Sequence, residues 1–107
     1  MTPQIELKQT AGLYIGRSKL DRWKWAVCID GELDKIQYAV YQLHKSQPKQ
    51  RVKIDTPQTK FTVSGVANGW FTVKCRVRLT TGAELDLEPL KLQLWYPDHV
   101  ETVVRDS

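Results

Sequence analysis

The chain has 107 residues, a length that suits one domain and is short for two. Hydrophobic residues make up 41% of it, enough for an apolar core without metals or disulfides. The 16 basic and 12 acidic residues leave a formal charge of +4, which is modest for a dedicated nucleic-acid binder. The two cysteines, Cys28 and Cys75, match neither a zinc motif nor a disulfide-rich secreted scaffold. We therefore expect one domain over residues 1–107, with no metal and no cofactor.

The start of the chain and its longest apolar runs bear on localisation. No apolar leader follows Met1, and no run of residues approaches the length of a membrane span. Together with the two unpaired thiols, this predicts a cytoplasmic protein that does not contact a membrane.

The positive charge is concentrated in residues 44–60. This segment carries Lys45, Lys49, Arg51, Lys53 and Lys60 against the single acidic residue Asp55. Such a segment favours an acidic partner surface, but it is also typical of an exposed sheet edge that Lys and Arg keep soluble. Both interpretations remain open, and nucleic acid is the least favoured partner.

Three segments in chain order show the pattern of β-strands. Trp23, Trp25, Val27 and Ile29 fall at spacing two, which predicts a strand with one buried face. Residues 36–43 are rich in β-branched and aromatic residues on both faces, which predicts a central strand. Residues 71–79 alternate most clearly, with Thr72, Lys74, Arg76 and Arg78 on the polar face.

The turn after residue 79 predicts a hairpin with a defined register. A three-residue loop, Thr80-Thr81-Gly82, with Gly82 in the left-handed conformation pairs Arg78 with Glu84 and Arg76 with Asp86. The same register pairs two apolar residues of each strand: Val77 with Leu85, and Cys75 with Leu87. Because both faces agree on one pairing, the register is well specified.

Shorter strands are expected at Ile5–Gln9, Tyr14–Ile15, Val52–Ile54, Phe61–Val63 and Leu90–Trp95. Pro89 predicts a bulge or a switch between sheets, because proline cannot donate to a strand ladder. We expect residues 97–107 to form a tail, either a final short strand or a frayed end. With no sustained helical periodicity, the pattern predicts an all-β antiparallel sandwich or barrel of seven to eight strands.

The sequence lacks the residue patterns of an enzyme active site. His44 and His99 have no nucleophile at a recognisable spacing, and the glycines form no phosphate-binding loop. We therefore expect a protein that is not an enzyme. Trp70 follows a turn-rich segment, where it either covers the core or forms part of a binding surface.

Several motifs together resemble the YEATS domain family, closest to its prokaryotic branch. They are residues 22–31, with the sequence RWKWAVCIDG, then LDKI at 33–36, VYQLH at 40–44, GWFTV at 69–73 and the Thr81-Gly82 hairpin. The resemblance covers about residues 22–94. It implies an immunoglobulin-like β-sandwich, in agreement with the strand pattern.

The resemblance also implies a recognition function. Eukaryotic YEATS domains bind acetyl- or crotonyl-lysine on histones, and the flat acyl amide stacks between two aromatic rings in a loop cleft. Acylation removes the charge of lysine, so the amide can leave water when it is stacked and hydrogen-bonded.

The family's binding segments correspond to residues 44–48 and 65–71 of this chain. His44, Ser46 and Pro48 match the first segment, while Gln47 stands where the family has an aromatic ring. In the second segment the ring position corresponds to Val66 or to Trp70, depending on the alignment. Transferring the family's site predicts these ligand-binding residues: His44, Ser46, Gln47, Gly65 and Trp70.

These observations predict a non-catalytic module that binds a peptide or an acylated lysine side chain in a loop cleft. His44 and Ser46 could instead close a turn without contacting a ligand. The first alternative function is an assembly domain that makes protein contacts through a sheet edge or an exposed tryptophan. The second is weak nucleic-acid binding through residues 45–60.

Overall fold

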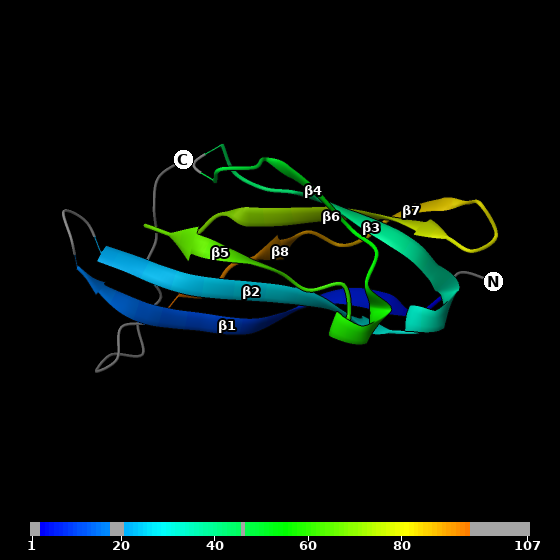
Figure 1. The fold of residues 1–107 in the computed structure, drawn as a ribbon, viewed down its shortest axis with the longest axis horizontal. Coiled ribbons are helices and arrows are strands. Elements are labelled where there is room, and N and C mark those ends of the chain that lie inside the picture. The colour runs from blue at the N-terminus through cyan, green and yellow to red at the C-terminus, as the bar shows by residue number, and fades with distance from the viewer. Residues whose placement is uncertain (1–2, 18–20, 46, 95–107) are drawn as a thin grey trace.

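Two antiparallel β-sheets face each other in the computed structural model, which describes residues 3–17, 21–45 and 47–94 (Figure 1). One sheet has three strands in the order β1-β2-β5, and the other has the order β4-β3-β6-β7, with β8 also paired to β6. Their bounds are Ile5–Arg17 for β1, Asp21–Gly31 for β2, Ile36–Gln42 for β3, Arg51–Ile54 for β4, Val63–Ala67 for β5, Thr72–Leu79 for β6, Glu84–Asp86 for β7 and Leu90–Lys91 for β8. The predicted antiparallel β-sandwich of seven to eight strands is confirmed.

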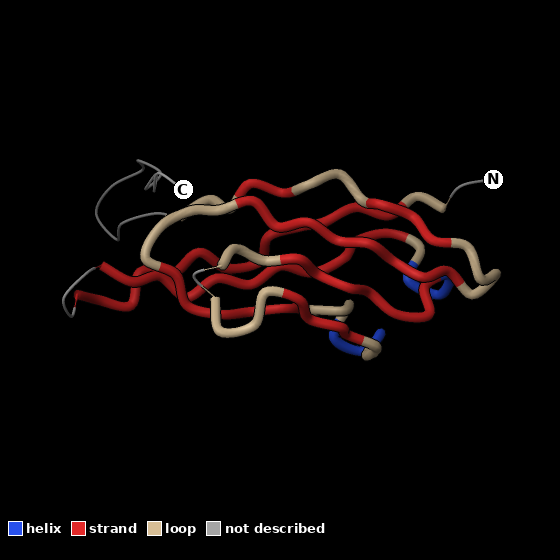
Figure 2. Tube along the Cα trace, turned by 90° about the horizontal axis from the view of Figure 1, so that it is seen from above, coloured by secondary structure: helices blue, strands red, loops and turns tan. Residues whose placement is uncertain are grey.

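The helical content of the described residues is limited to two short 3-10 turns, η1 at Leu33–Lys35 and η2 at Pro57–Thr59 (Figure 2). No helix in this part of the chain is long and apolar enough to cross a membrane. The predicted ligand residue Ser46, the residues Trp95 and Tyr96, and the tail at 97–107 lie outside the described residues.

The first strand is longer than the sequence pattern indicated. The segments expected at Ile5–Gln9 and Tyr14–Ile15 are parts of β1, which pairs with β2 along almost its whole length. The register shifts between Gln9 and Ala11 and again between Tyr14 and Gly16. Each shift inserts an unpaired residue and breaks the period-two pattern, which is why the alternation looked like two strands.

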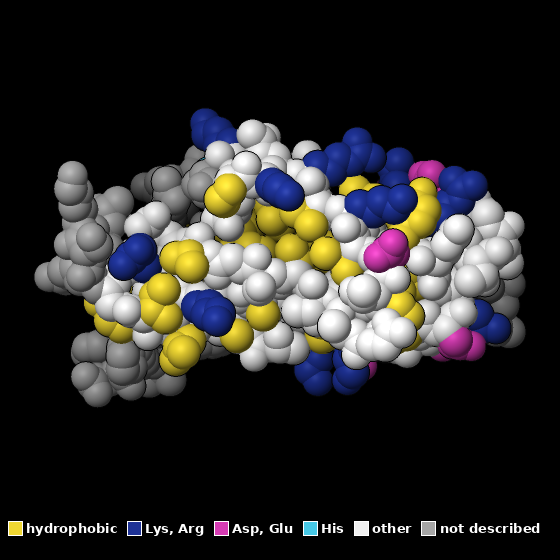
Figure 3. Space-filling view, in the orientation of Figure 1, with side chains coloured by type: hydrophobic (Ala, Val, Ile, Leu, Met, Phe, Trp, Pro, Cys, Tyr) yellow, Lys and Arg dark blue, Asp and Glu magenta, His cyan; other side chains and the backbone are white. Residues whose placement is uncertain are grey.

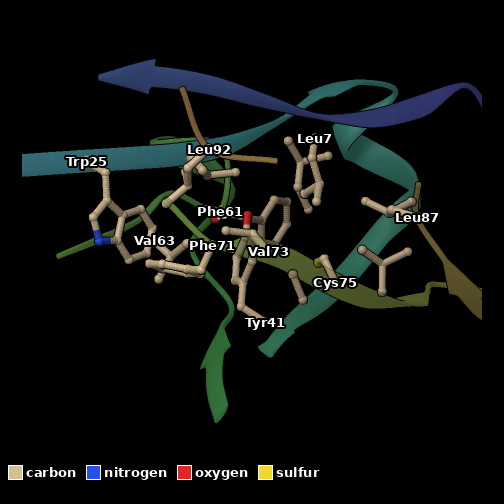
Figure 4. Close-up of a cluster of buried hydrophobic side chains, with 14 of the residues drawn as sticks. Leu7, Trp25, Tyr41, Phe61, Val63, Phe71, Val73, Cys75, Leu87 and Leu92 are labelled. Atoms are coloured by element: carbon tan, nitrogen blue, oxygen red, sulfur yellow. Dashed lines mark hydrogen bonds between the residues drawn. The ribbon is translucent and has the colours of Figure 1, made fainter. Parts of the chain in front are cut away.

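The core lies between the two sheets (Figure 4). Trp23, Trp25, Val27 and Ile29 all have an exposed fraction of 0%, as their spacing predicts. The Trp25 ring meets the ring of Phe71 from the opposite sheet edge-on, with centroids 5.4 Å apart. This contact joins the two layers next to the loops that follow β3 and precede β6.

The hairpin of β6 and β7 has the predicted register. Arg76 pairs with Asp86, Val77 with Leu85 and Arg78 with Glu84, and Gly82 has a φ of 94°. Arg76 Nε lies 2.6 Å from an Asp86 carboxylate oxygen, but both side chains are more than half exposed. The ion pair therefore fixes the register more than it stabilises the fold.

Pro89 marks a bulge and not a switch of sheet. Leu85 lies opposite Val77 and Leu90 lies opposite Val73, so five steps on one strand match four on the other. The chain therefore stays beside β6 with one extra residue. The strand predicted at Phe61–Val63 was wrong in position: Phe61 has a φ of 55° and ends a turn after η2, and β5 begins at Val63.

Candidate functional site

A small cleft lies where β3 ends and β6 begins. These strands are antiparallel neighbours, so the end of one and the start of the other meet at the same side of the sheet. The cleft has a volume of about 250 Å³. Its lining comes from the two strand ends and their loops: Gln42, Leu43, His44, Trp70, Phe71, Thr72 and Lys74.

Three aromatic side chains contribute to the cleft. The His44 and Phe71 rings have centroids 6.0 Å apart and are tilted by 32°. Phe71 is buried, whereas His44 and Trp70 are half-buried. Phe71 thus forms a fixed floor that belongs to the core, and the other two rings are accessible to a ligand.

Trp70 offers a hydrogen-bond donor that is not used within the described part of the chain. Its Nε1 atom is buried and has no hydrogen-bond partner there. The Nε1 atom of Trp25 shares this property, but Trp25 is fully enclosed in the core. A buried donor without an acceptor carries a desolvation cost, and the atoms packed around Trp70 Nε1 keep it out of reach of a ligand in the cleft.

The cleft is flanked by positive charge. Lys74 belongs to its lining, and Lys91 Nζ lies 4.3 Å from the Trp70 ring centroid in a cation–π contact. Lys91 reaches this position because it pairs with Thr72 after the bulge at Pro89. The described residues contain no cluster of metal-ligating side chains.

Gln47 and Gly65 meet each other outside the cleft lining. Gln47 has an exposed fraction of 6%, and its Nε2 atom donates to the Val66 carbonyl at 3.0 Å. Its backbone N–H donates to the His44 carbonyl at 2.9 Å. A Cβ atom on Gly65 would lie 2.8 Å from Gln47 Oε1 and 3.1 Å from the Trp25 ring. Gln47 therefore ties the loop that carries His44 to β5 of the other sheet.

Of the five predicted ligand residues, the structure places His44 and Trp70 at the cleft. The Gln47 amide, expected to face a polar ligand, instead donates to a backbone carbonyl. Sequence reasoning did not single out Gln42, Thr72, Lys74 or Lys91 as site residues. For Thr72 and Lys74 a signal existed, because strand alternation turns both outward. Gln42 reaches the cleft through its cross-strand pairing with Lys74, which only the structure shows.

Replacing Gly65 by alanine is expected to destabilise the fold by about 1–2 kcal/mol, because the added methyl group displaces Gln47 and presses on the Trp25 ring. Urea denaturation followed by circular dichroism measures the change. In a Gln47→Ala background the cost of Gly65→Ala should fall by at least about half, since one of the two clashes is gone. If Gly65→Ala destabilises the fold equally in both backgrounds, the contact between Gln47 and Gly65 does not position the loop that carries His44.

Two packed antiparallel sheets with a small aromatic cleft between the loops at one end define an immunoglobulin-like β-sandwich. The family model of the prokaryotic YEATS domain matches residues 23–89. Since this is more than half of the 107 residues, the chain belongs to the prokaryotic YEATS domain family. No curated protein matches the chain.

Solved structures share the fold. The yeast AF-9 homolog protein Yaf9 is 18% identical, with a TM-score of 0.62, and the match covers 94% of this chain and 70% of that one. A structure described as the Yaf9 YEATS domain recognising an H3K122suc peptide is 17% identical, with a TM-score of 0.61 over 84% of this chain and 68% of that one. At such identities, the similarity establishes the common fold.

Proposed function

We propose that the chain is a non-catalytic recognition module that takes an acylated lysine side chain of a peptide into the cleft beside His44 and Trp70. One observation carries this proposal: two accessible rings and a buried floor ring surround a cleft that suits a single side chain, between Lys74 and Lys91. A flat amide can stack on these rings.

The charge beside the cleft supports selection against unmodified lysine. A third ammonium group would be repelled by Lys74 and Lys91 and would lose hydration on entering. Acylation removes that charge. A succinyl group replaces the positive charge by a negative one, because it ends in a carboxylate that both lysines attract. The Yaf9 structure with an H3K122suc peptide gives a precedent for such a ligand within the fold.

Variants of the two accessible cleft residues should lose the interaction. Three forms of one fluorescein-labelled peptide, with acetyl-, succinyl- or unmodified lysine, are titrated and followed by fluorescence anisotropy. We expect binding of the acylated forms only, and His44→Ala and Trp70→Ala should each weaken it about tenfold, the value of one stacked ring. Trp70→Phe keeps a ring and should retain most of the affinity.

Gln58→Ala serves as the matched control, because Gln58 is exposed on η2 in the other loop region. Thermal melts establish that each variant remains folded. Equal affinity for all three peptides, or an acyl preference that survives His44→Ala and Trp70→Ala together, would contradict the proposal.

A further inference from the structure

The five-stranded sheet carries a second concave feature on its outer face, a groove of about 870 Å³. Figure 3 shows Lys and Arg side chains gathered along the upper side of the molecule, where β3, β4 and β7 lie in Figure 1. The charged residues that line the groove are four basic and two acidic: Arg51, Lys74, Arg76, Arg78, Glu84 and Asp86.

The charges lie in cross-strand rows. In the first row, Gln42 pairs with Arg51 on one side and with Lys74 on the other. In the second row, Val40 pairs with Lys53 and with Arg76. Successive rows on one face are two residues apart, a spacing of about 7 Å along the strands. An extended peptide repeats its side chains on one face at the same spacing.

The acidic residues compensate only part of this charge. Arg76 donates to Asp86 at 2.6 Å, and Arg78 Nη1 lies 3.4 Å from Glu84. The hydrogen bond from Arg76 lowers the pKa of the Asp86 carboxyl, so that pair stays ionised. Arg51, Lys53 and Lys74 make no ion pair with any residue that the structure describes. The uncompensated cations thus lie on β4 and at the start of β6.

The lining favours a peptide over a nucleic acid. Glu84 and Asp86 would repel phosphates that crossed the β7 side of the groove. Single-stranded nucleic acids stack successive bases on several rings, but the lining contains one aromatic ring, Tyr38, and Lys53 Nζ occupies one of its faces at 4.3 Å from the centroid. Val40 supplies apolar floor between the charges, which suits the side chains of a peptide.

We propose that this groove binds an extended acidic peptide that lies along the strands, with carboxylates two residues apart facing first the row of Arg51 and Lys74 and then Lys53, which borders the groove in the next row. The groove adjoins the cleft, because Gln42 and Lys74 line both. The groove proposal stands without the cleft, since its charges and shape come from the sheet face alone.

The test uses fluorescein-labelled peptides of about eight residues that alternate Glu with Thr or Lys with Thr, and a labelled oligothymidine of about twelve nucleotides. Fluorescence anisotropy at low salt should show binding of the Glu-Thr peptide. Arg51→Glu/Lys53→Glu should weaken it at least about tenfold, and Arg51→Gln/Lys53→Gln should weaken it less. The control Lys8→Glu/Lys24→Glu makes the same change in net charge on exposed strand positions of the other sheet, and should keep affinity within about twofold.

Circular dichroism and light scattering establish that the variants remain folded and monodisperse. If Arg51→Glu/Lys53→Glu aggregates, Arg51→Gln/Lys53→Gln is used for the test in its place.

Failure of the Glu-Thr peptide to bind overturns the proposal, as does an equal loss of affinity in the control variant. Tighter binding of oligothymidine, lost in the same β4 variants, would make the groove a nucleic-acid site. A loss in His44→Ala as large as in the β4 variants would place the peptide in the cleft. Normal acidic-peptide binding without any acyl-lysine binding would leave the groove standing while the cleft function fails.

Discussion

Replacing Trp25 by alanine is expected to lower the free energy of unfolding by about 3–5 kcal/mol. Trp25 is fully buried and contacts Phe71 across the two sheets, so the substitution leaves a large cavity that its neighbours cannot close. Since a domain of this size has a total stability of roughly 5–15 kcal/mol, much of the margin disappears.

The effect of Trp25→Ala reaches the cleft. Phe71 forms the cleft floor and loses its edge-on partner. Gly65, which lies in the strand that Gln47 ties to the loop carrying His44, loses the ring beside it. Chemical denaturation followed by far-ultraviolet circular dichroism measures the stability, because tryptophan fluorescence changes with the substitution itself. Leu13→Ala is the control on the neighbouring strand: Leu13 is 63% exposed, and the change should stay within about 0.5 kcal/mol. A loss below about 1 kcal/mol for Trp25→Ala would show that the contact between the sheets is dispensable.

Raising the pH from about 8 to about 11 should lower the free energy of unfolding by roughly 4 kcal/mol through two buried groups. Burial raises the pKa of Cys75 to about 12 from its ordinary value of 9.0. Burial also raises the pKa of Tyr41, whose hydroxyl donates to the Phe61 carbonyl at 2.6 Å. Both groups stay neutral in the folded chain and ionise in the unfolded chain. Their stabilisation is therefore complete below about pH 9 and is lost as the pH rises toward 12.

The variant Cys75→Ala isolates the larger contribution. It removes about 2–3 kcal/mol of the pH dependence, because the unfolded chain then has one group fewer to ionise. The two proteins differ only at Cys75, so the comparison is the difference between their pH profiles, measured by denaturation at several pH values. Parallel profiles would show that the Cys75 thiol ionises equally readily in the folded and unfolded chains.

The sequence could predict the sheets far better than the contacts between them. In the β6–β7 hairpin, one register pairs apolar residues on one face and opposite charges on the other. A slip of one residue would lose the pairs on both faces. His44 was identifiable through the resemblance of residues 44–48 to the family's binding segment, and Trp70 through the same resemblance and the turn-rich segment before it, where binding residues often lie. The bulges in β1 erased the local alternation, so one strand looked like two.

Other parts of the site depend on distances that no local pattern encodes. Gln47 and Gly65 lie in segments that belong to opposite sheets, and only the packing of those sheets brings the amide to the backbone. Lys91 lies over Trp70 because the bulge at Pro89 shifts β8 by one residue. Without that shift, the lysine would face the other side of the strand.

The hydrogen bond from Gln47 to Val66 also bears on self-association. β5 is the outer strand of its sheet, and an outer strand with unpaired backbone groups can recruit a strand from another molecule. The Gln47 amide occupies one of the carbonyls that such a strand would need. The loop that positions His44 therefore also blocks edge-to-edge pairing, so a substitution that frees this loop to admit a larger ligand also opens a route to aggregation.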